Sequence, residues 1–277
     1  MRWYLVKLFS VLVVLFFSMV WEAAASSRLN SDDFVLVAHA GGAIDGNAYT
    51  NSRQAIELSI DSGFSYLELD FSKSKDGEWY LLHDWPSWAS RTGYQGELPP
   101  SGNEVMQRLE GYAAAPSIHG VKSAYTTVSL SDLLGLLDKR SGFKVVTDTK
   151  TDADAMLLLG SIPEKYRERF IFQAYSLDGM RQMIGLIGEK KVILTAYQLN
   201  DWWRWDGFND EFLAALRHHP EMFGITVPLS VAYESEKLDR LLSAGIPVLV
   251  HGRPDEINSY NLPRQLMERG ISGAYVD

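Results

Sequence analysis

The chain has 277 residues, of which 46% are hydrophobic, 22% charged and 12% aromatic, a composition that excludes disordered, collagen-like and low-complexity proteins. The 35 acidic residues outnumber the 26 basic ones, and the net charge of −9 argues against nonspecific nucleic-acid binding. An anionic substrate stays possible, because a bound metal ion can invert the local field. The absence of cysteine excludes disulfides, thiolate metal sites, a cysteine nucleophile and a lipid-modified cysteine anchor.

Residues 1–25 predict a secretory signal peptide. Two basic residues precede an apolar run at 8–21, which is shorter than the roughly 20 residues that span a membrane, and Ala23 and Ala25 fit a cleavage site. The alternative is an uncleaved anchor that keeps the domain near a membrane. We expect 26–277 to form a periplasmic or secreted domain. Its 24 basic and 34 acidic residues would give a net charge of −10.

Apolar runs and helical periodicity alternate along the rest of the chain. Strands are predicted at 34–38, 64–71, 143–147, 170–174, 191–197, 223–227, 246–250 and 271–276, with a further extended piece at 79–82 after an Asp76-Gly77 turn. Helices are predicted at 52–63, 102–111, 131–139, after the capping Thr151, and at 177–187, 209–218, 230–243 and 255–269, with Ser52 and Ser131 as further caps.

Eight apolar strands separated by helices favour parallel pairing with right-handed crossovers, and therefore a closed (β/α)8 barrel of the TIM type. A doubly wound open sheet is the rival arrangement. Residues 84–124 are rich in Gly, Pro and Ser and are interpreted as an insertion after the second strand. The sequence stops at Asp277, directly after the eighth strand, so no final helix is expected.

Ionisable side chains stand at the ends of several predicted strands, where a barrel of this kind carries its functional residues. They are His39, Glu68, Asp70, His83, Asp84, Asp148 and Lys150. Glu68 and Asp70 share one strand face, and two unpaired buried carboxylates would be costly, so a divalent cation is the natural partner. Each residue alone also has a structural interpretation: a buried core histidine, a capping aspartate or a surface ion pair.

The order and spacing of these motifs resemble the glycerophosphodiester phosphodiesterase family. The similar segments are Ala38-His39-Ala40-Gly41, Thr50-Asn51-Ser52, Glu68-Leu69-Asp70, His83-Asp84 and the C-terminal stretch 270–277. The resemblance implies the same barrel, a catalytic pair made of His39 and His83, and metal ligation by Glu68 and Asp70. It also implies that Asp148 is the third ligand and Lys150 its basic partner.

The sequence departs from the family pattern at four places. Ala40 stands where the family has an arginine, Thr50 where it has a glutamate and Ser52 where it has a threonine. The Asp148-x-Lys150 spacing is closer to the related sphingomyelinase D lyases. The phosphodiester class is therefore predicted more firmly than a glycerol substrate. A glycerol- or sugar-linked diester and a lipid head group are both candidates.

The predicted residues form a coherent set for phosphodiester chemistry. One Mg²⁺ or Ca²⁺ on the three carboxylates would act as a Lewis acid, and Lys150 would contact a non-bridging oxygen. By resemblance, one histidine activates the nucleophile and the other protonates the leaving alcohol. The sequence leaves their order open, as it does the choice between attack by water and by a substrate hydroxyl, which would give a cyclic phosphate.

Further polar and aromatic residues near strand ends are candidates for the pocket. They are Trp85 and Trp88 as pocket wall, Gln173 and Tyr197 as polar contacts, Trp202 with its neighbours 203–205 as a platform or lid, and His251. Packing is an equal alternative for Trp202 with its neighbours and for His251.

Two other functions compete with the phosphodiesterase. The first is a non-catalytic or altered barrel that binds a glycan or phosphoglycan at the cell surface, suggested by the loss of the family arginine and glutamate. The second is glycoside hydrolysis, which is weak because Glu68 and Asp70 lie on one strand face instead of flanking a bond.

Overall fold

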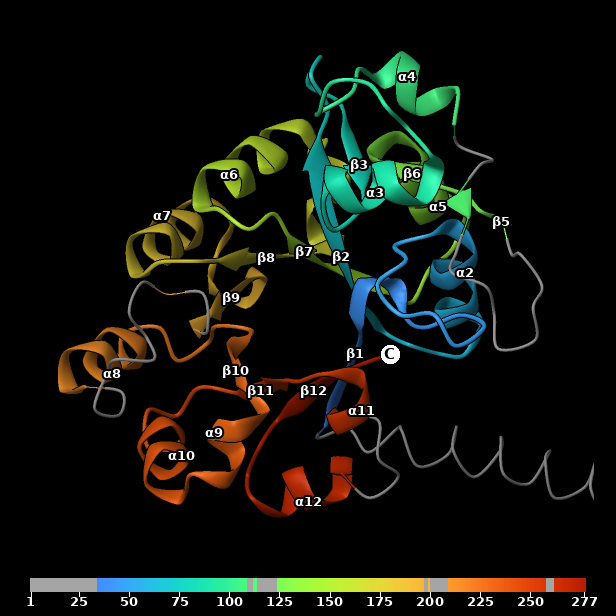
Figure 1. Cartoon of the computed structure of the whole chain (residues 1–277). Coiled ribbons are helices and arrows are strands. Elements are labelled where there is room, and N and C mark those ends of the chain that lie inside the picture. Colours follow the sequence, from blue (N-terminus) through green and yellow to red (C-terminus); the bar gives the residue numbers. More distant parts are fainter. Residues whose placement is uncertain (1–33, 109–111, 114–123, 197–198, 200–208, 258–261) are drawn as a thin grey trace, which may run out of the picture. The chain divides into compact units, whose positions relative to one another are not determined.

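The computed structural model describes residues 34–108, 112–113, 124–196, 199, 209–257 and 262–277. Within them Val35–Asp277 is a compact unit built on parallel strands. The strands are β1 (Val35–Ala38), β2 (Tyr66–Lys73), β7 (Lys144–Asp148), β8 (Phe170–Ala174), β9 (Val192–Thr195), β10 (Gly224–Pro228), β11 (Val248–His251) and β12 (Gly273–Val276). β1 pairs with β2 and also with β12, which closes the ring (Figure 1). The predicted (β/α)8 barrel is confirmed.

Helices follow the strands around the barrel. They are α2 (Arg53–Asp61), α5 (Leu130–Lys139), α6 (Asp152–Ser161), α7 (Leu177–Ile187), α8 (Asp210–Arg217), α9 (Leu229–Tyr233), α10 (Ser235–Leu242), α11 (Pro254–Ile257) and α12 (Leu262–Glu268). Side-chain caps start several of them. Ser52 accepts a hydrogen bond from the backbone of Ala55, and Thr151 accepts one from Asp154, as the sequence predicts.

Four predicted helices have different bounds in the structure. The helix predicted at 102–111 ends at Met106. The cap of α5 is Ser129 and not Ser131, because Ser129 and Asp132 cap each other's backbone reciprocally and the helix begins two residues earlier. The predicted helix 230–243 is two helices, since Glu234 adopts a non-helical backbone between α9 and α10. The predicted helix 255–269 is also divided into α11 and α12, and residues 258–261 lie outside the description.

The barrel interior is filled by one inward-pointing residue from each of six strands. These are Val37, Val146, Ile171, Ile193, Leu249 and Tyr275. Successive strand residues alternate between the two faces, so the residue two places after Val146 also points inward, one layer nearer the C-terminal mouth. That residue is Asp148. The apolar layer therefore forms the floor beneath the ionisable groups.

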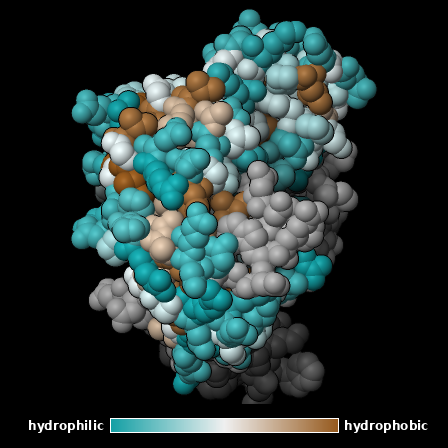
Figure 2. All heavy atoms as spheres, turned by 90° about the vertical axis from the view of Figure 1, so that its left-hand side faces the viewer, coloured by the Kyte–Doolittle hydropathy of each residue, from teal (hydrophilic) through white to brown (hydrophobic). Residues whose placement is uncertain are grey.

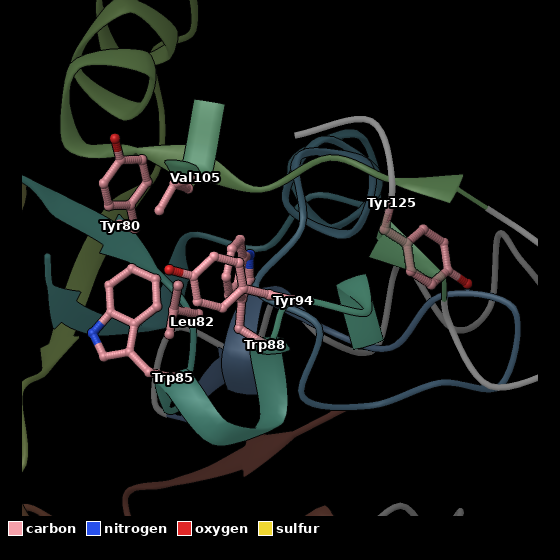
Figure 3. Close-up of a cluster of buried hydrophobic side chains, with 7 residues drawn as sticks. All are labelled: Tyr80, Leu82, Trp85, Trp88, Tyr94, Val105 and Tyr125. Atoms are coloured by element: carbon pink, nitrogen blue, oxygen red, sulfur yellow. The ribbon is translucent and has the colours of Figure 1, made fainter. Parts of the chain in front are cut away.

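The segment after β2 builds a small subdomain with its own core. β2 runs on into an antiparallel hairpin with β3 (Trp79–Leu81), which pairs in turn with β6 (Val128–Ser129). The rest of the segment contains α3 (Trp85–Thr92), α4 (Gly102–Met106), β4 (Tyr112–Ala113) and β5 (Ala124–Tyr125). Figure 3 shows the side chains that pack in this core: Tyr80, Leu82, Trp85, Trp88, Tyr94, Val105 and Tyr125.

The described face that carries α6, α7 and α8 is mainly polar (Figure 2). On the side where α6, α7 and α8 lie, hydrophobic residues form small separate groups on a hydrophilic surface (Figure 2). Single exposed apolar residues such as Leu157 and Leu186 are normal on a protein surface. Among the described residues, none of the helices combines the length and the apolar character that a membrane crossing requires. The predicted signal peptide lies outside these residues.

Candidate metal and acid–base site

Three buried carboxylates meet at the mouth of the barrel. The alternation of β2 turns both Glu68 and Asp70 inward, and the register of β2 with β7 pairs Asp70 directly with Asp148. Each of the three residues is no more than 5% exposed. One oxygen from each lies within 4.8 Å of the others. This hard, oxygen-only donor set suits Mg²⁺ or Ca²⁺.

Backbone and side-chain donors hold the three carboxylates in place. The Asn51 side chain donates to Asp70 Oδ2 (2.8 Å) and accepts from the Asp70 backbone N–H (3.0 Å). The backbone N–H of Ala40 donates to Glu68 Oε2 (2.8 Å), and Tyr175 Oη donates to Asp148 Oδ1 (2.8 Å). Ala40 and Asn51 both have positive φ angles, 48° and 50°, which non-glycine residues rarely adopt. Strained backbone thus supports this cluster.

Lys150 is the cation of this cluster. Its Nζ lies 2.6 Å from Asp70 Oδ1 and 2.6 Å from Asp148 Oδ2. Burial acts to lower the pKa of Lys150, but the charges of Asp148 and Asp70 outweigh it and raise the pKa. The sequence predicted that Lys150 would contact a phosphate oxygen. The structure places it between two carboxylates, with 37% of its side chain exposed.

The positive charges of His39 and Lys150 do not offset the burial of Glu68. Burial raises the pKa of Glu68 to about 8, and the charge of Asp70 adds to the effect. Burial also acts to raise the pKa of Asp70, but Lys150 and Asn51 stabilise its ionised form and lower the pKa. Lys150 thus balances the Asp70 side of the cluster, while Glu68 holds its proton unusually tightly. A further, multivalent positive charge would keep all three carboxylates ionised, so the donor set fits a divalent cation.

His39 is buried beside the carboxylates. It begins the short 3-10 turn His39–Gly41 that follows β1. Its Nδ1 lies 3.2 Å from Asp277 Oδ1 at the end of the chain, and its Nε2 lies 3.9 Å from Glu68 Oε2. Burial acts to lower the pKa of His39, but the hydrogen bond to Asp277 and the charge of Glu68 raise it overall.

His83 reaches the same mouth from the subdomain. The hairpin returns the chain alongside β2, so that the backbone N–H of Leu82 donates to the carbonyl of Asp70. His83 follows directly, with 47% of its side chain exposed and its Nδ1 2.7 Å from Asp84 Oδ2. Asp84 also caps α3 through the backbone N–H of Ser87. Asp84 therefore has the predicted capping role, and His83 beside it still faces solvent.

Tyr49 lies between the two histidines. Its ring meets His39 edge-on at 4.6 Å between centroids and His83 at 6.5 Å. It also borders a cavity of about 330 Å³ whose other lining residues are Leu82, His83, Asp84, Ser87, Trp88 and Arg91. This cavity therefore gives solvent and small molecules access to His83.

The remaining predicted pocket residues are placed differently. Trp85 belongs to the subdomain core, where its Nε1 donates to the carbonyl of Lys73. Trp88 lies in the same core and also borders the cavity of about 330 Å³. Gln173 is buried inside the barrel, where it accepts a hydrogen bond from Thr195. Tyr197 and Trp202 lie outside the described residues.

Several residues of the site escaped the sequence interpretation. Asn51 was part of a recognised motif, but nothing in the sequence linked its side chain to Asp70. Tyr49 and Tyr175 lie in loops that carry no spacing signal. Asp277 directly follows the eighth strand, so the strand-end rule that selected Asp148 could have found it.

The closed barrel with ionisable groups at its C-terminal mouth defines the fold class, and solved structures specify it further. No family model and no curated protein matches the sequence. A Galdieria sulphuraria protein assigned as a glycerophosphodiester phosphodiesterase is 16% identical, covers 88% of this chain and 93% of its own, and has a TM-score of 0.63. The Thermotoga maritima glycerophosphodiester phosphodiesterase is 18% identical, with coverages of 88% and 94% and a TM-score of 0.59.

A third similar structure contains a ligand. The Oleispira antarctica phosphodiesterase in complex with the product sn-glycerol-3-phosphate is 17% identical, covers 87% of this chain and 92% of its own, and has a TM-score of 0.60. The chain therefore has the barrel fold of the glycerophosphodiester phosphodiesterases.

Proposed function

We propose that this protein is a metal-dependent phosphodiesterase that cleaves a glycerophosphodiester-like or a sugar- or lipid-linked phosphodiester. The observation that carries the proposal is the convergence of Glu68, Asp70 and Asp148 within 4.8 Å, with His39 Nε2 3.9 Å from Glu68. The fold shared with phosphodiesterases, one of which binds sn-glycerol-3-phosphate, supports it.

Glu68, Asp70 and Asp148 would hold the cation. When bound, a divalent cation supplies Lewis-acid neutralisation of a phosphodiester. Lys150 brings a further positive charge to the same mouth and is partly exposed to solvent. Ala40 stands where the similar family has an arginine, so it offers no guanidinium group to a phosphate. Its backbone N–H donates a hydrogen bond to Glu68. Phosphate binding in this chain would therefore rely on Lys150 and on a cation held by the three carboxylates.

His39 and His83 would perform the two proton transfers. His39 is held by Asp277 inside the barrel mouth, while His83 faces solvent beside Asp84. Two imidazoles on the two sides of Tyr49 can serve the attacking and the leaving oxygen of one diester, since imidazole exchanges protons near neutral pH.

Phosphorus NMR of a turnover tests the proposal and its chemistry together. The protein is incubated with glycerophosphocholine, with a glycerophosphosugar and with bis(p-nitrophenyl) phosphate, with Mg²⁺, with Ca²⁺ and with EDTA. The proposal expects a new monoester or cyclic phosphate signal that depends on metal and is lost in D148N, but not in the matched surface variant D239N. Metal-independent cleavage, or cleavage of a nitrophenyl glycoside in place of every diester, would contradict it.

We also propose that the domain is exported. The support is the basic start, the apolar run at 8–21 and the small residues at Ala23 and Ala25. Expression of the full chain followed by mass determination of the product tests this point. A mature N-terminus at residue 26 in the extracytoplasmic fraction is expected, whereas an intact N-terminus in the membrane fraction would favour the anchor.

A further inference from the structure

A third histidine contacts the proposed catalytic His39. His251 is the last residue of β11, and its Nε2 lies 3.2 Å from Nε2 of His39. The two rings meet edge-on, with centroids 4.7 Å apart and an interplanar angle of 84°. On the opposite edge, Nδ1 of His39 lies 3.2 Å from Asp277 Oδ1. Both ring nitrogens of His39 are thus engaged by partners from the last two strands of the barrel.

The barrel holds His251 firmly in this position. Its backbone is registered against Pro228 in the β10–β11 pair. Its ring packs edge-on against Tyr275, with centroids 5.5 Å apart. Tyr275 is itself buried, and its hydroxyl lies 3.2 Å from Thr226 Oγ1. His251 is therefore a fixed point against which the ring of His39 can be oriented.

Orientation matters for His39 because the χ2 torsion of histidine is broad and roughly two-fold. A ring held at one nitrogen only can rotate about the Cβ–Cγ bond or flip. An ionised carboxylate only accepts hydrogen bonds, so Asp277 selects the form of His39 that carries a proton on Nδ1. The second contact, at Nε2, fixes the plane of the ring. Nε2 is also the nitrogen nearest Glu68, so this edge faces the carboxylates.

We propose that His251 is a positioning residue for His39 in the chain Asp277–His39–His251, an inference that rests on the proposed phosphodiesterase function. Burial and the charge of His39 lower the pKa of His251 to about 3, so it stays neutral and keeps a nitrogen lone pair to accept from a protonated His39. When His39 is neutral, the Nε2–H tautomer of His251 donates to it instead. The hydrogen bond can thus form in both protonation states of His39 before substrate binds, and a bound diester would take its place at Nε2.

The position of His251 also allows a chemical rescue. Besides touching His39, it borders a cavity of about 700 Å³ that Tyr49, Leu229, Gly252 and Arg253 also line. Imidazole from solution can therefore reach the space that a truncated residue 251 would leave. A purely structural role in packing on Tyr275 would give imidazole no effect on turnover.

Two amide variants separate the hydrogen bond from the ring. In H251Q the amide reaches about as far as the lost Nε2, whereas in H251N it is one methylene shorter and falls short of His39. With the metal-loaded protein and bis(p-nitrophenyl) phosphate, H251N and H251G are expected to lose about 10-fold or more in kcat with KM within twofold. H251Q should keep most of the wild-type kcat, and imidazole should restore part of the activity of H251G.

Long-range ¹H–¹⁵N NMR of the His39 ring gives a readout that does not need activity. The Nδ1–H tautomer is expected in all of these proteins because Asp277 selects it. The ¹⁵N shift of Nε2 reports the hydrogen bond to residue 251, so it should be similar in the wild type and H251Q and change in H251N. Equal kcat and an unchanged His39 spectrum in folded H251N would overturn the positioning role. If the wild type cleaves no diester while the NMR spectra change as expected, the proposed function fails and the orientation of His39 by His251 stands.

Discussion

Asp70 and Asp148 are direct partners across the β2–β7 ladder, so their carboxylates meet although the whole subdomain separates them in the sequence. This register makes the two residues one unit, bridged by the ammonium group of Lys150 at 2.6 Å from each. A change at either aspartate therefore alters the charge that the other one experiences.

Removal of one carboxylate should abolish stabilisation by metal. At a cation concentration about 100 times the Kd, binding adds about 2.7 kcal/mol, which is about 5–10 °C in Tm for a protein of this size. We expect this rise in the wild type and only a small part of it in D148N, measured by thermal unfolding with Mg²⁺ or Ca²⁺ against EDTA. The matched control is D239N, an exposed aspartate on α10. Equal shifts of Tm in the wild type, D148N and D239N would show that Asp148 does not bind a metal ion.

Truncation of His83 should reduce turnover without unfolding the protein. A general acid or base contributes about 10²–10⁴-fold, so H83A should lose that factor in kcat. Its half-exposed side chain makes one exposed hydrogen bond, to Asp84, so the free energy of unfolding should fall by only about 1 kcal/mol or less. H218A, at an exposed histidine after α8, is the control. Near-normal kcat in H83A on a good substrate would exclude His83 from the chemistry.

Substitution of Asn51 should lower the free energy of unfolding substantially. Asn51 is fully buried, and both the nitrogen and the oxygen of its side-chain amide form hydrogen bonds with Asp70. In N51G the positive φ is relaxed, so the loss should be that of the hydrogen bonds, about 1–3 kcal/mol. N51A should lose about 1–2 kcal/mol more, because alanine is strained at φ 50°. Urea unfolding of both variants measures the difference. Equal stabilities of N51A and N51G would show that the backbone at this position relaxes.

Asp84 should make the protein sensitive to acid. Burial acts to raise the pKa of Asp84, but the hydrogen bonds from His83 and Ser87 outweigh it and lower the pKa below the ordinary 3.8. A carboxyl with a lowered folded-state pKa stabilises the protein above its unfolded pKa, and this stabilisation is lost as the pH falls through the folded pKa.

The variant D84N isolates this charge because its amide oxygen can still cap α3. The difference in unfolding free energy between wild type and D84N should be largest near pH 7 and shrink below pH 3.8. Urea unfolding at pH 7, 5 and 3 measures it, with D239N as the control. A difference that stays constant over this range would mean that the Asp84 charge does not stabilise the fold.

The barrel was predictable because its strands are short, apolar and separated by amphipathic helices. Period-two alternation also placed Glu68 and Asp70 on one face. The caps were harder, since Ser129 and Ser131 both precede the same apolar run and only the reciprocal bond with Asp132 selects the first. The helix break at Glu234 depends on the backbone angles of one residue, and hydrophobic periodicity does not report such angles.

The partners of the site residues could not be predicted because they arise from tertiary contacts. Nothing local connects His39 with His251 or Asp277, which meet it only when the ring closes. The place of Trp85 was also undetermined, because nothing in the sequence shows that Trp85 and Trp88 on α3 pack in the core of the subdomain. The position of Lys150 between the aspartates follows from the register of two strands that the insertion separates.

The ring of strands closes where β1 meets β12, and the contact between His39 and Asp277 joins residues 238 positions apart. Contacts of such long sequence separation form slowly, because loop-closure entropy opposes them until the rest of the chain is ordered. A chain without β12 and Asp277 has no partner for Nδ1 of His39. Asp277 can therefore orient that imidazole only once the ring has closed, so the orientation depends on one of the slower contacts of folding.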